Sequence, residues 1–511
     1  MLAAALLFAT GIYAVVEVND SGGVTVSHMR RVTMAAPIEP VDASSEWDAV
    51  LVADGREKAR VPLAIDDTWR VEYGVHGAIA ASRQQGARTA VVRLPYEERG
   101  RLEIERRGDR VASFDIQTTV AASTADLVPL RTAGDPRNRL DLLLLGDGYT
   151  AADRDTFLAD ARKITQNFFA ISPYREYAGF VNVVALFTPS AQPGADHPLC
   201  SDPTSNDDPK RGTMVSTAFD ATYCGNGTFR GVTVNVSKVY DAAAAYPEWD
   251  RIGVIVNDDT YGGSGGPIWV VSTHMQGTEI AQHEFGHSFS GLTDEYTSPW
   301  AGATFCSDVA GRSPCEPNAT DGTARDRLKW LPWVEPATPI PTPPHQLDAI
   351  GLYEGARYRS TGYYRSRLQC LMNAFGTGGV TIPFCEVCRQ AFVLRLYEGW
   401  TSFTPQKIEL IENAAPSTPL SASLGNPVTF SVAPLQTENG TIQRHWAVNG
   451  TVMASGSDTF TFTPTAAGSY EIRLEVADAT PFVRPLRSSM TATHTWQLTA
   501  GTFPKRRAVR Q

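Results

Sequence analysis

The chain has 511 residues, of which 42% are hydrophobic and 20% are charged, and its formal net charge is −10. This composition is typical of a folded globular protein, and the length exceeds what one hydrophobic core supports, so we expect two to four domains. The negative charge argues against a nucleic-acid-binding or anionic-membrane-binding protein, because either would present a basic face. We therefore expect no nucleic-acid partner.

The chain begins with an apolar run of about fifteen residues, MLAAALLFATGIYAVV. A membrane-spanning helix needs about twenty residues, so this run is too short to cross a bilayer, and no other stretch is long and apolar enough. The run resembles a secretory signal peptide, with small residues near Ala14 where cleavage could occur. We expect residues 1–22 to be such a segment in a protein that is secreted, periplasmic or on a bacterial cell surface. No Lys or Arg precedes Arg30, which either a start codon assigned too late or a non-secretory buried strand would explain.

Short runs of alternating apolar and polar residues, separated by turn residues, occupy positions 23–128. TWRVEYGV and TAVVRLPY are two of these runs. Their close spacing predicts an all-β sandwich. The segment carries no catalytic constellation, so we assign it a packing or substrate-positioning role.

Helix and strand patterns alternate over residues 129–404. LDLLLLGDGYT at 140–150 is a continuous apolar run, typical of a strand buried on both faces. Thr150 and Asp153 then form a capping-box pattern that begins a helix. Further buried strands are predicted over 181–187 and 251–257. This order predicts an α/β domain.

The segment QHEFGHSFSGLTDEY at 282–296 contains the pattern HExxH, formed by His283, Glu284 and His287. Two histidines four residues apart lie one turn apart on one helix face, so both imidazoles can reach a single metal ion. At about 100° per residue, the apolar residues of this segment fall on the side opposite the histidines. One face should meet a core and the other a cleft. The apolar residues are Ala281, Phe285, Phe289 and Leu292.

A catalytic zinc ion needs a third protein ligand and one position open to water. Gly291 allows the chain to turn after the helix, and the chain then presents the acidic pair Asp294 and Glu295. We predict Asp294 as the third ligand and keep Glu295 as the alternative, because adjacent side chains in an extended segment point opposite ways. Glu284 is predicted to act as the general base on a zinc-activated water and to protonate the leaving amine. The expected cofactor is one catalytic Zn²⁺ ion.

HEFGHSFSGLTDEY resembles the signature of the IgA-peptidase family of zinc metallopeptidases, which is related to the metzincins. Segments 140–150, 256–266, 354–358 and 363–372 resemble further blocks of the family in the same order. The chain departs from the common metzincin pattern by having three residues, not two, between the second histidine and the glycine. The resemblance implies a metzincin-like zincin domain. It also implies that Met372 lies beneath the metal in a Met-turn.

Seven cysteines fall into three groups along the chain. Cys200 with Cys224, and Cys306 with Cys315, close short loops as disulfides of an exported protein would. The third group consists of Cys370, Cys385 and Cys388. No fourth Cys or His that would complete a zinc knuckle lies nearby, so we predict a disulfide from Cys370 to one of the other two.

Two loops before the predicted zinc helix invite functional interpretations. The acidic segment 201–208 is a candidate for structural calcium, but it lacks the regular ligand spacing of a calcium loop, and we expect it to be solvated. YGGSGG at 261–266 lacks the GK[ST] of a phosphate loop. We interpret it as a flexible rim of the cleft whose backbone pairs with an extended substrate. A bulky residue at Gly263 is then expected to raise KM.

Strand patterns return over residues 405–502, in runs such as VTFSV, IQRHWAVNG and SYEIRLEV. Their spacing predicts a small sandwich with Trp446 on an inner strand. No cysteine pair crosses its sheets, so it resembles the immunoglobulin-like modules of secreted bacterial enzymes. A spacer role is expected, with cell-surface or carbohydrate contact as alternatives. Residues 503–511 are predicted to be a solvated basic tail.

The sequence therefore predicts a multidomain protein, α/β plus all-β, with a zincin domain between two β-sandwiches. Its predicted function is that of a secreted, monomeric zinc endopeptidase acting on extracellular proteins, and its substrate preference is not encoded in any segment. One alternative is a metal-holding adhesion protein without turnover, which would not need Glu284. The other is a zinc amidase acting on cell-wall components. Tyr296 and the tyrosines near Tyr363 are candidates for oxyanion stabilisation.

Overall fold

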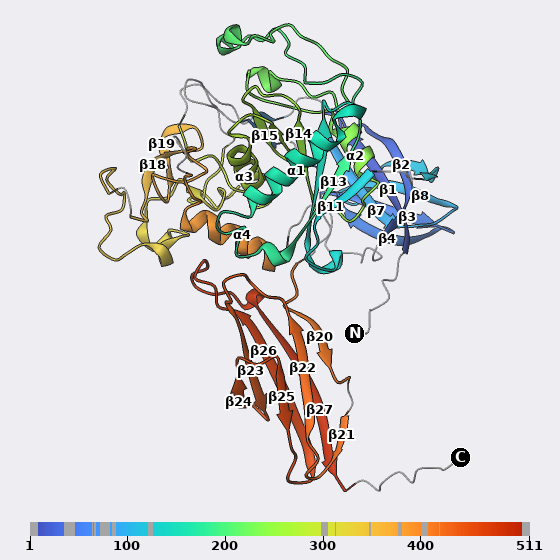
Figure 1. Cartoon of the computed structure of the whole chain (residues 1–511), viewed down its shortest axis with the longest axis vertical. Helices are drawn as coiled ribbons and strands as arrows, with labels where there is room; N and C mark the ends of the chain where they lie inside the picture. The colour runs from blue at the N-terminus through green and yellow to red at the C-terminus, as the bar shows by residue number, and fades with distance from the viewer. Residues whose placement is uncertain are drawn as a thin grey trace.

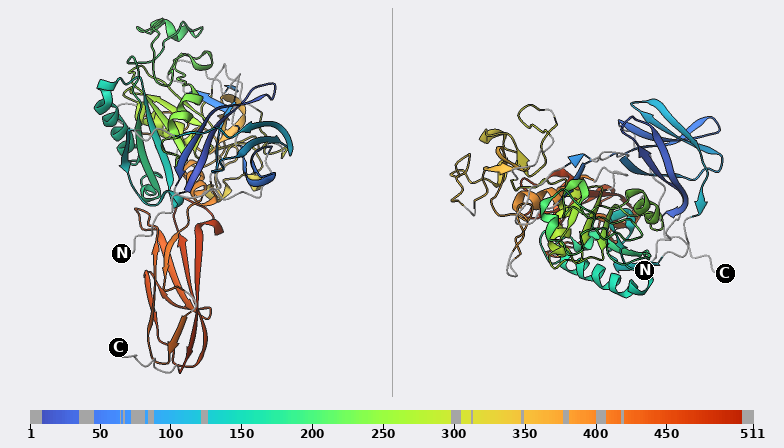
Figure 2. Two further views of the ribbon diagram at one scale, coloured as in Figure 1. Left: turned by 90° about the vertical axis from the view of Figure 1, so that its right-hand side faces the viewer. Right: turned by 90° about the horizontal axis from the view of Figure 1, so that it is seen from above.

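The computed structural model has three structural parts in chain order (Figure 1), except that residues 68–71 and 82–83, which the sequence predicts to be in the N-terminal sandwich, join the sheet of the middle part. An α/β part lies in the middle, all-β parts flank it, and the C-terminal part projects away from the other two (Figures 1 and 2). The fold is thus mixed α/β with all-β flanks, as predicted. The structure describes residues 9–34, 46–63, 65, 68–71, 82–83, 88–120, 126–297, 305–311, 313–346, 349–376, 381–399, 407–417 and 420–502.

The N-terminal part consists of two four-stranded sheets with the strand orders β10-β2-β1-β7 and β4-β3-β8-β9. Apolar side chains that alternate along these strands meet in a core between the two sheets. The strands are β1 (Ala9–Val18), β2 (Val24–Met34), β3 (Trp47–Ala53), β4 (Arg56–Pro62), β7 (Arg88–Pro95), β8 (Gly100–Arg106), β9 (Asp109–Asp115) and β10 (Thr119–Val120).

β1 is buried on both of its faces. Ile12 and Ala14 face the core between the two sheets, whereas Tyr13 and Val15 pack against the α/β part. The Tyr13 hydroxyl donates a hydrogen bond of 2.7 Å to the Tyr240 carbonyl there. Where the signal-peptide interpretation covered residues 1–22, the structure instead has a strand between two cores over 9–18, which explains the uninterrupted apolar run. Residues 1–8 lie outside the described residues.

The middle part is built on an eight-stranded mixed sheet with the order β11-β13-β12-β14-β16-β15-β5-β6. The strands β13, β12, β14 and β16 are parallel, and the outer strands are antiparallel to their neighbours. β12 is buried along its whole length, as its apolar sequence predicts. The strands are β5 (Thr68–Val71), β6 (Ser82–Arg83), β11 (Asp126–Arg131), β12 (Leu140–Asp147), β13 (Val181–Phe187), β14 (Arg251–Val256), β15 (Gly263–Gly265) and β16 (Ile268–Ser272).

Helices pack on both faces of this sheet. α1 (Arg154–Phe168), α3 (Gly277–Ser288) and α4 (Glu386–Glu398) share one apolar core with one face, and α2 (Val236–Ala243) packs on the other. The predicted capping box is confirmed just before α1, where the Thr150 backbone N–H donates a hydrogen bond of 2.9 Å to Asp153 Oδ2. The central sheet is therefore enclosed between α1 with α3 on one side and the N-terminal sheets with α2 on the other.

A small antiparallel sheet of β17 (Ala319–Thr320), β19 (Arg359–Arg365) and β18 (Tyr353–Ala356) follows α3 in the chain. It lies on the side of the α/β part opposite the N-terminal sheets (Figure 2). Short 3-10 helices connect the larger elements at Pro136–Asn138, Ala151–Asp153, Ala178–Phe180, Pro203–Asp207, Gly225–Gly227, Arg325–Arg327, Leu331–Trp333 and Ser488–Met490.

The C-terminal part contains a three-stranded sheet, β20-β22-β25, and a five-stranded sheet, β21-β27-β26-β23-β24. Trp446 lies on the inner strand β23, as predicted, and stacks on Trp496 with ring centroids 5.5 Å apart. The strands are β20 (Ile411–Ala415), β21 (Leu420–Ser423), β22 (Val428–Pro434), β23 (Ile442–Val448), β24 (Thr451–Ser455), β25 (Thr459–Phe462), β26 (Gly468–Asp478) and β27 (Thr491–Gly501). The predicted basic tail, 503–511, lies outside the described residues.

Buried hydrogen bonds join the C-terminal part to the α/β part. The Tyr177 and Tyr397 hydroxyls donate to Asp478 Oδ2 at 2.6 and 2.8 Å. Within the part of the chain that the structure describes, no helix has both the length and the apolar character needed to cross a membrane.

Candidate metal centre

Three donor atoms from α3 and the loop after it meet at one point. His283 Nε2 lies 2.9 Å from His287 Nε2 and 3.0 Å from Asp294 Oδ1, and His287 Nε2 lies 3.3 Å from the same Oδ1. All three side chains are buried. A tetrahedral ion with ligands at about 2.0–2.1 Å places neighbouring ligand atoms about 3.3 Å apart. This donor triangle therefore has the dimensions of one zinc-sized site.

Hydrogen bonds behind the two histidines fix their tautomers. The Nδ1 atoms of His283 and His287 lie 2.9 Å from the Leu371 carbonyl and 2.7 Å from the Leu292 carbonyl, respectively. A carbonyl only accepts, so each Nδ1 carries a proton and donates it. In neutral imidazoles, both Nε2 lone pairs then point to the same place, an arrangement that a bound cation stabilises. The residues present thus fit a divalent metal ion.

Asp294 is held from two directions by the segment before β19. The Tyr358 hydroxyl donates to its Oδ2, and the Arg357 amide donates to its carbonyl at 3.0 Å. Burial alone would raise the pKa of Asp294, but when no metal ion is bound, the positive charges of protonated His287 and His283 and their hydrogen bonds hold that pKa well below its ordinary value. The carboxylate is therefore ionised, as a metal ligand must be.

The adjacent acids Asp294 and Glu295 point to different places. Glu295 Oε1 accepts a hydrogen bond of 2.9 Å from the Asn318 amide and lies 3.2 Å from Cys388 Sγ. Burial raises the pKa of Glu295 to about 8, although the hydrogen bond from Asn318 lowers it in part. Of the two carboxylates considered as the third ligand, the one that lies beside the histidines is that of Asp294.

The side chain of Glu284, a residue of α3, lies against β15. A Cβ added at Gly265 would lie 2.4 Å from Glu284 Oε2 and 3.1 Å from His287 Cδ2. Real Cβ atoms do not approach so closely, so the strand needs a residue without a side chain at this point. The buried carboxylate of Glu284 therefore occupies the space beside the donor triangle that Gly265 leaves open.

The glycine-rich segment is a paired strand of the central sheet. β15 pairs with β16 on one side and with β5 on the other, through Ser264 with Val71 and Gly265 with Arg70. An added Cβ at Gly263 would meet Ile280 Cγ2 at 2.5 Å, so Gly263 faces the packed helix α3. The predicted flexibility is wrong for Gly263–Gly265, because both edges of this strand carry strand partners, whereas pairing of its backbone with a substrate stays a prediction.

Met372 lies against α3 at Gly286, which directly precedes His287. A Cβ added at Gly286 would lie 3.1 Å from Met372 Sδ, and Met372 is fully buried. Its carbonyl accepts a hydrogen bond of 2.7 Å from the Glu295 amide. Met372 therefore packs against the helix that carries the two histidines, and its role in a Met-turn stays a prediction.

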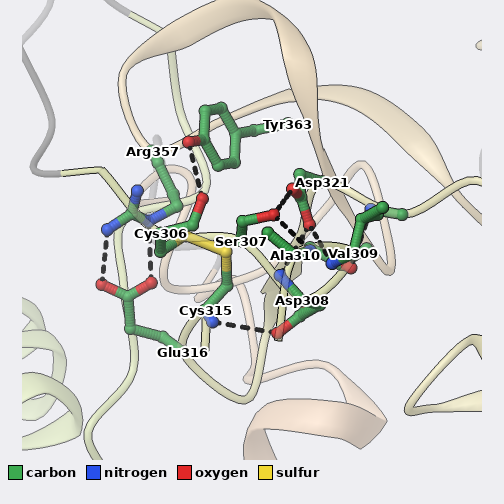
Figure 3. The surroundings of a disulfide bond; sticks show 12 residues. Cys306, Ser307, Asp308, Val309, Ala310, Cys315, Glu316, Asp321, Arg357 and Tyr363 are labelled. Carbon is green, nitrogen blue, oxygen red and sulfur yellow. Dashed lines mark hydrogen bonds and ion pairs between the residues drawn. A yellow bond between two sulfur atoms is a disulfide. The ribbon is translucent and has the colours of Figure 1, made fainter. Parts of the chain in front are cut away.

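A loop closed by a disulfide supports the residues that hold Asp294 (Figure 3). The predicted disulfides Cys306–Cys315 and Cys200–Cys224 are both present. Next to Cys315, the Glu316 carboxylate pairs with the Arg357 guanidinium, with Nε and Oε2 2.7 Å apart. Arg357 directly precedes Tyr358, so this ion pair helps to place the hydroxyl that contacts Asp294.

Two tyrosines considered for oxyanion stabilisation, Tyr363 and Tyr296, contact other protein groups. The Tyr363 hydroxyl donates a hydrogen bond of 3.0 Å to the Cys306 carbonyl, so it belongs to the packing of the disulfide loop (Figure 3). The Tyr296 ring packs 5.5 Å from the Tyr358 ring. Tyr358 ends the segment 354–358, which resembles a family block, but its contact with Asp294 was not predicted, because that contact joins residues 64 positions apart.

The acidic loop surrounds a buried histidine. His197 Nδ1 lies 2.7 Å from Asp208 Oδ2, and its Nε2 lies 3.1 Å from Asp258 Oδ2. Lys210 Nζ lies 2.8 Å from the other oxygen of Asp258. These carboxylates are paired with cationic groups, which leaves no reason to assign them calcium. The expectation of a solvated loop is wrong for Asp208, which is buried.

Comparison with known proteins identifies one family. Residues 128–348 match IgA Peptidase M64. No curated protein matches the chain. Among solved structures, a CARDB domain from Pyrococcus furiosus is 17% identical, with 17% of this chain and 89% of that chain covered and a TM-score of 0.13. The fibronectin(III)-like modules of Clostridium thermocellum CbhA are 11% identical, with 17% and 97% covered and a TM-score of 0.13. The matched residues 128–348 include the whole donor triangle, and this part of the chain belongs to the IgA peptidase M64 family.

Proposed function

We propose that this protein is a secreted zinc-dependent endopeptidase. The observation that carries the proposal is the convergence of His283 Nε2, His287 Nε2 and Asp294 Oδ1, while the Nδ1–H group of each histidine donates a hydrogen bond to a backbone carbonyl. Two imidazoles and a carboxylate are a donor set that zinc accepts in catalytic sites, with a fourth position left for water. Membership of a peptidase family supports peptide bonds as the substrate class. The two disulfides support export, because disulfides persist in oxidising compartments.

Zinc held by the donor triangle would polarise the scissile carbonyl and make its water a nucleophile near neutral pH. Glu284 follows His283 in the chain, and a Cβ added at Gly265 would lie close to both Glu284 Oε2 and His287 Cδ2, which supports a role for this carboxylate beside the triangle. In the proposed mechanism, Glu284 accepts the proton of the attacking water and then donates it to the leaving amine. Tyr358 keeps Asp294 in place through its hydrogen bond to Oδ2.

The substrate would approach along β15, the strand next to Glu284. Extended peptides bind sheet edges through their backbone groups, but β5 already pairs with the outer edge of β15 at Ser264 and Gly265. His283, Glu284 and Asp294 are each at most 1% exposed. We infer that β5 and an extended substrate compete for the same edge, so that β5 restrains activity until it is displaced.

The direct test compares the same type of substitution, Glu to Gln, at two positions on α3. Glu284→Gln is expected to abolish hydrolysis while the zinc content stays at the wild-type level. Glu279→Gln, in the first turn of the same helix, is the matched control and should retain full activity. A fully active Glu284→Gln variant would overturn the mechanism.

The substrate class is tested by mass-spectrometric profiling of a mixed proteome, with and without a chelator. New peptide termini that disappear with the chelator are the expected result. Hydrolysis of cell-wall amides without cleavage of proteins would point to the amidase alternative. Zinc binding without cleavage of either would point to an adhesion protein.

A further inference from the structure

We propose that Cys370, Cys385, Cys388 and Glu295 bind a second zinc ion, which is structural and distinct from the catalytic one. The four residues come from three segments: the loop after α3, the turn around Met372, and the first turn of α4. One donor atom of each lies within 4.8 Å of the donor atoms of the other three. All four side chains are at most 2% exposed. Four protein ligands with no open position are typical of structural zinc sites.

The separations fit a tetrahedral ion better than a disulfide. With Zn–S near 2.3 Å and Zn–O near 2.0 Å, a tetrahedron places two sulfurs about 3.8 Å apart and a sulfur and an oxygen about 3.5 Å apart. Cys370 Sγ and Cys388 Sγ are 3.7 Å apart, and Cys388 Sγ and Glu295 Oε1 are 3.2 Å apart. A disulfide would require about 2.05 Å. The predicted disulfide from Cys370 is therefore wrong, and all three thiols are free.

The surroundings of the cluster also suit a cation with thiolate ligands. The Cys385 amide lies 3.3 Å from Cys370 Sγ and donates to it, and Ser366 Oγ lies 3.3 Å from Cys385 Sγ. Such contacts orient and stabilise thiolate ligands. Glu295 Oε2 is buried and has no hydrogen-bond partner, although buried carboxylate oxygens normally have one. A metal ion bound to the Glu295 carboxylate would provide the favourable electrostatic interaction that the surrounding protein groups do not give to Oε2.

The cysteine count favours a metal as well. Four of the seven cysteines form disulfides, which leaves an odd number in a protein that we propose is exported. One disulfide within the cluster would leave a buried thiol and a buried carboxylate without compensation. A divalent ion uses all three sulfurs and the carboxylate together.

The second site would brace the donor triangle from behind. Glu295 directly follows Asp294, and the Glu295 amide donates to the Met372 carbonyl. Cys370 directly precedes Leu371, whose carbonyl accepts the hydrogen bond from His283 Nδ1. A metal ion that ties Glu295 to Cys370 and to the start of α4 therefore fixes two segments that orient the catalytic ligands.

The experiment measures metal content per chain in the full-length protein, purified without chelator. The wild type is expected to hold two zinc ions, and the His283→Ala/His287→Ala variant one. The Cys200→Ser/Cys224→Ser variant is the matched control for loss of sulfur and should still hold two. The zinc content therefore reports on the two sites separately. If the catalytic assignment is wrong, the zinc bound by the cysteines can still be measured in the double-histidine variant.

Cobalt substitution identifies the ligands without relying on cysteine variants that fold poorly. Cobalt(II) in the His283→Ala/His287→Ala variant should show the near-ultraviolet thiolate-to-cobalt charge-transfer absorption that nitrogen and oxygen ligands do not produce. In the wild type, the three free thiols should react with a thiol reagent only after chelation. A metal-free double-histidine variant, or a disulfide among Cys370, Cys385 and Cys388 in the unreduced chain, would overturn the proposal.

Discussion

Tyr358 donates a hydrogen bond to Asp294 Oδ2, the oxygen that faces away from the two histidines. The contact places a buried hydroxyl behind the carboxylate of the proposed third ligand. Groups that hydrogen-bond to a metal ligand orient it and affect how tightly the ion is held. This relationship leads to the first prediction.

Tyr358→Phe keeps the ring and removes only the donor to Asp294. Loss of a group behind a metal ligand typically weakens metal affinity about 10–100-fold. We expect a decrease of this size in the affinity for the catalytic zinc, measured by competition with a chelator. Tyr363→Phe removes a comparable hydroxyl, which donates to the Cys306 carbonyl, and should leave zinc affinity unchanged. Equal affinities in the two variants would refute the role of Tyr358.

Gly265→Ala places a methyl group where the Glu284 carboxylate lies. The added Cβ would be 2.4 Å from Glu284 Oε2, so the carboxylate has to move. A displacement of about 1 Å in a reacting group can cost about 10²-fold in rate. We expect kcat to fall by about this factor while zinc content is retained. Gly322→Ala, whose added Cβ meets no atom closer than 3.4 Å, is the control and should leave kcat unaltered.

Gly263→Ala should act on stability, and not on KM as the sequence alone predicts. Its added Cβ would meet Ile280 Cγ2 at 2.5 Å and the Val270 carbonyl at 3.0 Å. Overpacking of this kind typically costs about 1–3 kcal/mol. Urea unfolding is expected to show this loss. A raised KM without any loss of stability would restore the cleft-rim interpretation.

Replacement of residues 64–87 by a short Gly-Ser linker removes β5 and frees the outer edge of β15. If β5 occupies the position of an extended substrate, the variant should have a lower KM on peptides than the wild type. Steady-state kinetics on a peptide found by proteome profiling provide the measurement. Thermal unfolding of both proteins checks that the N-terminal sheets remain folded. An unchanged or higher KM in a folded variant would show that β5 does not restrain activity.

His197 provides a prediction for the pH dependence of stability. Burial would lower its pKa, but hydrogen bonds to Asp258 and Asp208 raise the pKa above its ordinary value. A raised folded-state pKa stabilises the fold fully below the unfolded pKa of about 6.5, and this contribution is lost as pH rises through the folded pKa.

His197→Gln should therefore destabilise the protein most at about pH 6, by about 3 kcal/mol, because it leaves the buried carboxylate of Asp208 without its cationic partner. The difference from the wild type should shrink at higher pH. Chemical denaturation at several pH values provides the measurement. His345→Gln, at an exposed histidine, is the control and should show no such trend. A difference that is constant across this range would exclude the proposed charge pairing.

Local sequence patterns were sufficient to predict those elements whose conformation depends on interactions between residues close together in the chain. The capping box at Thr150, the buried strand β12 and the helical spacing of His283 and His287 depend on neighbours within a few residues. Hydrogen bonding and side-chain periodicity within one element determine such features. The candidate ligands on α3 could therefore be named before the fold was known.

Long-range packing decided everything that joins distant segments. Whether Asp294 or Glu295 meets the histidines depends on Tyr358 and Asn318, which belong to other segments. The apolar run at the N-terminus became β1 because two separate cores flank it. The three cysteines meet Glu295 only after the turn at Met372 and the start of α4 pack against the loop that follows α3. Sequence spacing fixes which side chains share one helix face, whereas burial in a common core determines which distant side chains meet.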